Sequence, residues 1–165
     1  MIDFDEFEDE DDIDLERFED QQNEPLREDP SRTIYEQALS ELKAGRKASH
    51  WMWFVFPQCD GVADHYGQKP SEMTVWFGIA GLVEAEAYLK HEVLGPRLID
   101  CFATCLESGQ TDPVQMFGEA DAAKLRACAT LFERTPNAPA VFSAALDTFF
   151  DGKRCEATLA LTSAK

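Results

Sequence analysis

The chain has 165 residues, of which 32 are Asp or Glu and 15 are Lys or Arg, so its formal net charge is −17. A chain this acidic lacks the basic surface with which most proteins bind nucleic acids or anionic membranes, and both partners are excluded on that ground. The first 30 residues hold 15 of the acids and two of the bases, whereas the rest of the chain is nearly balanced. The charge therefore argues against large polyanions, but it does not exclude a small anion held in a local cationic pocket.

The composition indicates one independently folding domain. Apolar residues make up 44 % of the chain and include 12 Phe and 3 Trp, enough to form a core at this length. The five cysteines lack paired spacing, so neither a disulfide framework nor a zinc ribbon is expected. No apolar run is long enough to cross a membrane, and acids stand where a secretory signal would carry bases. We expect a cytoplasmic protein.

Residues 1–13 alternate acids with Ile2, Phe4, Phe7 and Ile13. So many like charges cannot collapse against each other, which predicts a disordered acidic tail followed by a domain over residues 14–161. Two interpretations of the tail stay open. It keeps the protein in solution, or it docks on a basic protein.

Helical periodicity begins after the tail. Leu15 and Phe18 indicate a short helix from Asp14, and the capping box of Thr33 and Glu36 begins a helix over residues 34–44. The apolar run 51–56 is compatible with a buried strand or a buried helix, and residues 59–70 resemble a loop.

The second half of the chain is patterned as a series of helices with short connections. Apolar faces recur within residues 82–89, 94–105, 120–134 and 141–150. Asp112-Pro113 begins a helix of one or two turns that is followed by Gly118, and a last short helix is expected around 156–161. Because no longer strand pattern alternates with them, we predict a mainly α, compact single domain of about seven helices.

The densest chemical cluster is the segment 46–53, which is followed by Gln58. Arg46, Lys47 and Ser49 could hold an anion, Trp51 or Trp53 could stack on a flat ring, and His50 could act as a general acid or base. The alternative is structural: the indoles belong to the core, and the cations neutralise the carbonyl end of the preceding helix.

Two other pairs of residues are candidate chemical sites. Arg126 and Thr130 share a helix face and could extend a cationic pocket, or Arg126 could form a surface ion pair. Cys101 and Cys105 are also four apart, but no second pair complements them, so core packing is preferred to a metal site. The sequence contains no phosphate loop or dinucleotide fingerprint, and no cofactor or metal is expected.

Several motifs occur together in the order that is typical of one family. They are GRKASHWMWFVFPQ at 45–58, Leu94-Gly95-Pro96-Arg97-Leu98, Phe117-Gly118, Lys124-Leu125-Arg126, Thr130-Leu131-Phe132 and Phe149-Phe150 with Gly152. With them, residues 14–161 resemble the DUF1810 family of bacterial proteins. The resemblance implies a mainly helical, Rv1873-like domain without an established activity. The chain departs from the family pattern at Asp121-Ala122-Ala123 and in a longer loop 59–74.

The resemblance favours a functional site, because polar residues are not needed to fill a core. The residues concerned are Arg46, Lys47, Ser49, His50, Trp51, Trp53, Gln58, Arg97, Lys124, Arg126 and Thr130. The first hypothesis is a pocket for a small anionic, ring-containing metabolite such as a nucleotide derivative, with binding preferred to catalysis and His50 as the acid or base if a reaction occurs. The second is a non-enzymatic interaction module that uses the acidic tail.

Overall fold

The computed structural model describes residues 13–163, which form eleven helices and no strand. In chain order they are α1 (Glu16–Gln22), α2 (Ile34–Lys43), α3 (Met52–Val55), α4 (Val62–His65), α5 (Glu72–Trp76), α6 (Leu82–Lys90), α7 (Leu94–Glu107), α8 (Pro113–Phe117), α9 (Glu119–Glu133), α10 (Ala140–Phe150) and α11 (Glu156–Ser163).

The prediction of a mainly helical domain is confirmed, but the count of about seven helices is wrong for the described part of the chain. Four of the eleven, α3, α4, α5 and α8, have only four or five residues each. A helix of one turn shows too few positions for periodicity to be read from sequence. The apolar run 51–56 adopts the helical alternative as α3, and α4 lies inside the segment that was predicted to be a loop.

The start of α2 follows the sequence signal. The Thr33 hydroxyl accepts a hydrogen bond from the Glu36 N–H at 3.2 Å, and the Glu36 carboxylate accepts one from the Thr33 N–H at 2.8 Å. These two bonds satisfy N–H groups that the first turn of a helix leaves without partners. The helix ends at Lys43, two residues before Gly45, which has a φ of +76°. The helix is therefore fixed locally at both ends.

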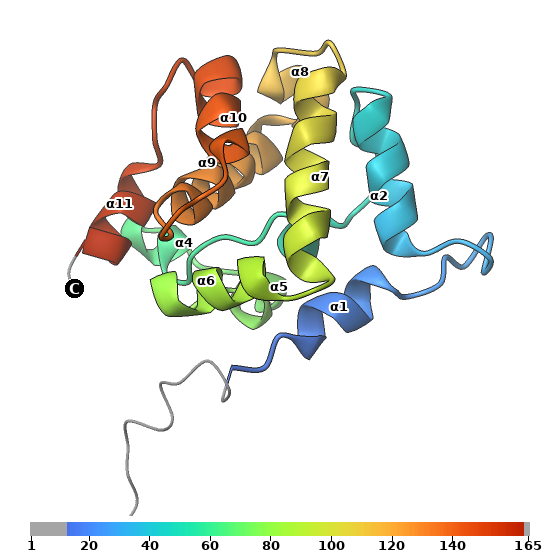
Figure 1. Ribbon diagram of the computed structural model, residues 1–165, viewed down its shortest axis with the longest axis horizontal. Coiled ribbons are helices and arrows are strands. Elements are labelled where there is room, and N and C mark those ends of the chain that lie inside the picture. Colours follow the sequence, from blue (N-terminus) through green and yellow to red (C-terminus); the bar gives the residue numbers. More distant parts are fainter. Residues whose placement is uncertain (1–12, 164–165) are drawn as a thin grey trace, which may run out of the picture.

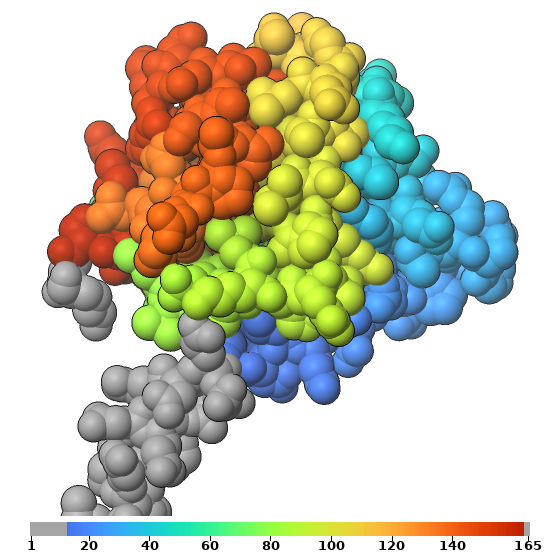
Figure 2. Space-filling view, viewed as in Figure 1, coloured from blue at the N-terminus to red at the C-terminus, as the bar shows by residue number. Residues whose placement is uncertain are grey.

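Two long helices organise the core. Helix α7 packs against α2, α6 and α10, and α9 packs against α6, α8, α10 and α11. Figure 1 shows α7 upright in the middle of the molecule with α6 crossing below it, and Figure 2 shows α10, α7 and α2 as neighbours across one face. Large side chains without solvent exposure fill the space between them, among them Trp51, Tyr88, Phe102, Phe132 and Phe142.

All five cysteines are buried and free. Burial raises the pKa of the Cys59 thiol to about 11 and that of Cys101 to about 12, so both are protonated at neutral pH. Within residues 13–163, no three His, Cys, Asp or Glu side chains converge as a metal site would require. The same residues contain no helix with the length and apolar character of a membrane span.

The predicted tail falls almost entirely outside the described residues, which begin at Ile13. Ile13 is half-buried and packs against the core. The prediction for residues 1–12 stays a prediction.

Candidate functional site

The polar segment 46–51 is organised around one buried carboxylate, that of Glu41 on α2. Glu41 lies on the same helix face as Ala38 and Leu42, which are also buried. Its two oxygens accept hydrogen bonds from the Ala48 N–H (2.7 Å), the Ser49 N–H (2.9 Å), the Ser49 hydroxyl (2.6 Å), the Trp51 indole N–H (2.9 Å) and the Gln37 carboxamide (2.9 Å). We call Glu41 and these donors the Glu41 cradle.

The cradle holds Glu41 in its ionised form. Burial by itself would raise the pKa of this carboxyl group, but the hydrogen bonds from Ser49, Ala48, Gln37 and Trp51 outweigh burial. Together they lower the pKa from 4.5 to about 2. Ser49 and Trp51 therefore use their polar groups to hold the chain after α2, which is a structural task.

Lys47 connects the same segment to α9. Its ammonium group lies 3.0 Å from the Asp121 carboxylate, donates to the Ser49 carbonyl and stands 4.9 Å from the centre of the Trp51 ring. Arg46 and His50 are exposed, and no described residue forms a hydrogen bond or ion pair with either side chain. The segment thus turns some of its polar groups inward and leaves two at the surface.

The two indoles have different environments. Trp51 is completely buried, so its ring faces are covered by the core. Trp53, two residues later on α3, is half-buried and lines a pocket. Of the two candidate stacking surfaces, the structure leaves Trp53 accessible.

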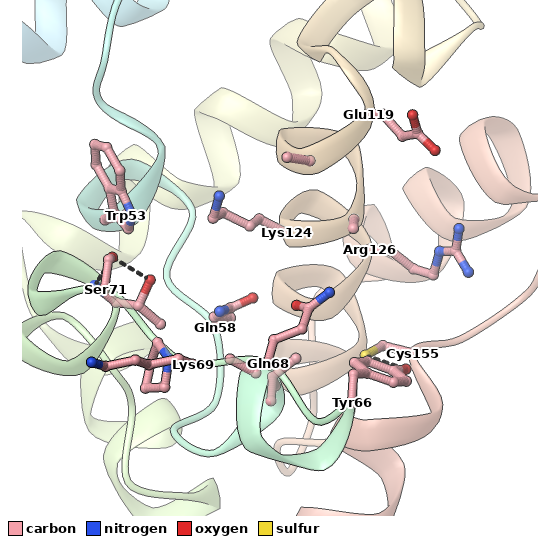
Figure 3. Close-up of a pocket in the computed structure, with 16 residues that line it drawn as sticks. Trp53, Gln58, Tyr66, Gln68, Lys69, Ser71, Glu119, Lys124, Arg126 and Cys155 are labelled. Atoms are coloured by element: carbon pink, nitrogen blue, oxygen red, sulfur yellow. Dashed lines mark hydrogen bonds between the residues drawn. The ribbon is translucent and has the colours of Figure 1, made fainter.

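The pocket with Trp53 runs along α9 and has a volume of about 700 Å³. Besides α9, its walls come from Trp53 and Gln58, from the segment 62–74 and from the residue before α11 (Figure 3). The lining residues are Trp53, Gln58, Val62, Ala63, Tyr66, Gln68, Lys69, Pro70, Ser71, Thr74, Glu119, Ala120, Ala123, Lys124, Arg126 and Cys155. We call it the α9 pocket.

The α9 pocket brings together four of the residues that the sequence singled out, namely Trp53, Gln58, Lys124 and Arg126. The other seven do not line it: Arg46, Lys47, Ser49, His50, Trp51, Arg97 and Thr130. The expected cluster therefore separates into a structural cradle, a few surface groups and one side of a pocket.

Arg97 and Thr130 make contacts elsewhere in the fold. Arg97 donates to the Gln22 carboxamide oxygen at 3.0 Å, and its guanidinium carbon lies 4.4 Å from the centre of the Tyr35 ring. The buried Thr130 hydroxyl donates to the Arg126 carbonyl at 2.8 Å and accepts from the Cys155 N–H at 3.0 Å. Thr130 thus ties the start of α11 to α9, and so places Cys155 beside the pocket.

The two cations of α9 have unequal surroundings. Lys124 lies 3.2 Å from Asp121, which it shares with Lys47, and 5.8 Å from the centre of the Trp53 ring. Arg126 is two residues further on and leaves the helix in the opposite direction in Figure 3. Its guanidinium carbon is 4.9 Å from the centre of the Phe150 ring, and no described carboxylate forms an ion pair with it.

The Nε atom of Arg126 is buried and lacks any hydrogen-bond partner in the described part of the protein. A buried polar group without a partner costs free energy, and such groups are rare in folded proteins. Among the described residues, the guanidinium group of Arg126 therefore has no ion-pair partner and an incomplete set of hydrogen bonds.

The segment 62–74 and the start of α11 supply pocket residues that the sequence did not single out, chiefly Tyr66, Lys69, Ser71, Thr74 and Cys155. The Tyr66 hydroxyl is 3.7 Å from the Cys155 sulfur and accepts from the Ala157 N–H at 3.3 Å. The pKa of Tyr66 is raised, chiefly because its hydroxyl is desolvated. The sequence gave no signal for these residues for two reasons. The segment 62–74 carries no recognised motif, and nearly 90 positions separate Tyr66 from Cys155.

Three cations, Lys69, Lys124 and Arg126, line the α9 pocket against one carboxylate, Glu119. Aromatic rings from Trp53 and Tyr66 and hydroxyl groups from Ser71 and Thr74 complete the walls. Such a surface can attract an anion, contact a flat ring and form hydrogen bonds. No histidine lines it, and the described residues of the pocket present no paired carboxylates.

Comparison with known proteins places the chain in a family. A solved structure with a similar fold is that of the conserved hypothetical protein Rv1873 from Mycobacterium tuberculosis, which is 36 % identical, has a TM-score of 0.82 and matches over 93 % of this chain and 99 % of its own. No curated protein matches the chain. The family model described as "Protein of unknown function (DUF1810)" matches residues 12–162. The chain is therefore a member of the DUF1810 family.

Proposed function

We propose that this protein binds a small anionic metabolite that contains a ring, and that the α9 pocket is the binding site. The observation that carries the proposal is the state of Arg126, a cation in the pocket wall whose buried Nε lacks a partner among the described residues. A bound anion would supply the missing opposite charge and would accept hydrogen bonds from the guanidinium group. Charge-assisted hydrogen bonds from arginine to phosphate or carboxylate are among the strongest that proteins form.

The charge of the pocket supports an anion. The whole chain has a net charge of −17, yet the pocket lining has three cations and one acid. The pocket also begins along the first turns of α9, where the helix dipole adds positive potential. A local excess of positive charge in an acidic protein favours small anions, because a large polyanion would meet the acidic surface around it.

The size and walls of the pocket support a small molecule. Ligand sites for small molecules typically enclose about 300–1,000 Å³ and combine apolar walls with a few polar groups. The α9 pocket, at about 700 Å³, falls in this range, and Trp53 offers a ring surface on the side opposite to Arg126. Binding needs no further group, whereas catalysis would need an acid, a base or a nucleophile suited to the reaction.

The test is a thermal-shift screen of the full chain against nucleoside phosphates and sugar phosphates. A ligand at 100 times its Kd stabilises a protein by about 2.7 kcal/mol. At this chain length that corresponds to a rise in Tm of roughly 5 °C or more. We expect at least one compound to reach this shift in the wild type.

Two arginine variants then locate the site. Arg126→Gln removes the pocket cation, and we expect it to weaken binding at least tenfold. Arg134→Gln is the matched control, since Arg134 is exposed at the end of the same helix and does not line the pocket. The proposal fails if no anion raises the Tm, or if the two variants bind the ligand equally well.

The alternative function is an interaction module in which the acidic N-terminal residues dock on a basic protein. The feature that favours it is the composition of residues 1–12, which contain eight acids, two Phe and no base. Capture of a basic partner would be sensitive to salt and would disappear when these residues are deleted. Capture that survives the deletion would remove this alternative.

A further inference from the structure

Gln58 occupies a fixed position in the wall of the α9 pocket. Its carbonyl accepts a hydrogen bond from the Ile79 N–H at 2.9 Å, and the next residue, Cys59, forms a parallel bridge with Ile79. The Asp60 N–H returns to the Ile79 carbonyl at 2.7 Å, and the preceding Pro57 is buried. These contacts anchor the backbone on both sides, so the side chain of Gln58 starts from a rigid point.

The carboxamide of Gln58, in contrast, has no partner in the part of the chain that the structure describes. The carboxamides of two other glutamines are hydrogen-bonded within the protein. The buried Gln22 donates to the Phe54 carbonyl at 2.8 Å and accepts from Arg97, and Gln37 donates to Glu41. Gln58 is half-buried like Gln37 and lines the pocket, yet no described protein group binds its donor or its acceptor.

A narrow hollow of about 10 Å³ opens beneath this point of the pocket. It shares Trp53, Gln58, Thr74 and Lys124 with the α9 pocket, and two buried rings, Phe56 and Phe77, close it. Its volume is close to the limit of about 10–15 Å³ at which a cavity holds one water molecule. A ring is too large for this hollow, so only an edge or an exocyclic group of a ring bound in the α9 pocket could reach it.

A carboxamide presents a hydrogen-bond donor next to an acceptor in one plane. The complementary ligand edge has an acceptor next to a donor in one plane, as the edges of nucleobases do, and glutamine pairs with adenine in this way. A sugar or a carbocycle has hydroxyl groups that point out of its ring plane. The flat ring of Trp53, which lines the α9 pocket, also matches an aromatic ring better than a puckered one.

We infer that the metabolite bound in the α9 pocket is a nucleoside phosphate, and that Gln58 determines its specificity by hydrogen bonding to the edge of the base. The inference rests on the proposed function. The base lies between Trp53 and Thr74 with its edge toward Gln58, and the phosphate lies further along α9 toward Arg126. Figure 3 shows Trp53 and Arg126 on opposite sides of Lys124, which separates the two ends.

The experiment is isothermal titration calorimetry of the full chain with the four common nucleoside 5′-monophosphates and with ribose 5-phosphate. We expect at least one nucleotide to bind tenfold more tightly than ribose 5-phosphate. In Gln58→Leu, which is similar in size and has no polar group, affinity for that nucleotide falls about tenfold, and affinity for ribose 5-phosphate changes less than twofold.

Gln115→Leu is the matched control, because Gln115 is an exposed carboxamide on α8 that does not line the pocket. It should leave the ratio of the two affinities unchanged. If ribose 5-phosphate binds the wild type as tightly as every nucleotide, or if Gln58→Leu weakens both ligands equally, the inference is wrong while the anion site stands. If none of these compounds binds, the inference fails, whereas the proposed function is decided by the wider thermal-shift screen. Circular dichroism and denaturant unfolding of each variant separate a binding effect from a folding defect.

Discussion

The Glu41 cradle and the α9 pocket each take side chains from the segment 46–58, and they differ in whether their polar groups have partners within the protein. In the cradle, one carboxylate accepts from five donors. In the pocket, Gln58 lacks a hydrogen-bond partner and Arg126 lacks an ion pair among residues 13–163, and the Nε of Arg126 is buried as well.

Pairing within the protein separates structural polar residues from ligand-binding ones. A polar group that is satisfied inside the protein contributes to stability, and its loss leaves other buried groups unpaired. A polar group that is left unpaired in a pocket contributes little to stability and can contribute to binding. Substitutions in the cradle should therefore change the free energy of unfolding, and substitutions in the pocket should change affinity.

The largest effect is expected for Glu41→Gln. All five partners of the Glu41 carboxylate are hydrogen-bond donors. The amide replaces one of the two acceptor oxygens with an NH₂ group, so the N–H and O–H groups that bind this oxygen lose their acceptor. We expect the free energy of unfolding to fall by about 3 kcal/mol, since breaking a buried hydrogen-bonded network costs about that much. Urea denaturation measures it. Glu107→Gln, at an exposed helix end, is the control and should change stability by less than about 0.5 kcal/mol.

The same carboxyl group predicts an acid dependence of nearly equal size. Its pKa is about 2 in the folded protein and 4.5 without these contacts, so the ionised form stabilises the fold above pH 4.5. This contribution is lost as the pH falls from about 4.5 to about 2, and a shift of this size corresponds to roughly 3 kcal/mol. Unfolding at a series of pH values should show this loss in the wild type and a smaller one in Glu41→Gln. Parallel pH curves for the two proteins would contradict the assignment.

A smaller effect is expected when residues 1–12 are deleted. The deletion removes eight acids and leaves Ile13, which packs against the core. Less negative charge repels an anion less, so affinity for the tightest-binding nucleotide should rise about threefold at low salt. At 0.5 M salt the difference should disappear because the charges are screened. An affinity gain that persists at high salt would require a direct contact between the tail and the site.

The smallest effect is expected for His50→Ala and Arg46→Ala. Both side chains are exposed, and neither lines the α9 pocket. Ligand affinity should stay within twofold of the wild type and stability within about 0.5 kcal/mol, which is usual for surface substitutions. A tenfold loss of binding in either variant would move the site from α9 to the segment 46–50.

The segment 46–58 shows which features of the candidate site could be predicted from the sequence. The pattern left a ligand site and a structural role open. The structure places Trp51 in the core, whereas Trp53 and Gln58 line a pocket, and ligand binding there stays a prediction. Glu41 was missed, although it shares a helix face with Ala38 and Leu42, and this spacing was the available signal. A charged residue on an apolar face deserves to be read as a buried acceptor.

By itself the sequence determined the longer helices, the helical class and the family membership. The Thr33–Glu36 capping box and the apolar periodicity of the longer helices act over three to four residues, so they are legible in a single chain. Only the tertiary structure decided which polar groups are paired and which line the α9 pocket, because Gln58, Lys69, Arg126 and Cys155 meet through packing and not through spacing. Partner choice depends on contacts distant in sequence, and no local pattern encodes them.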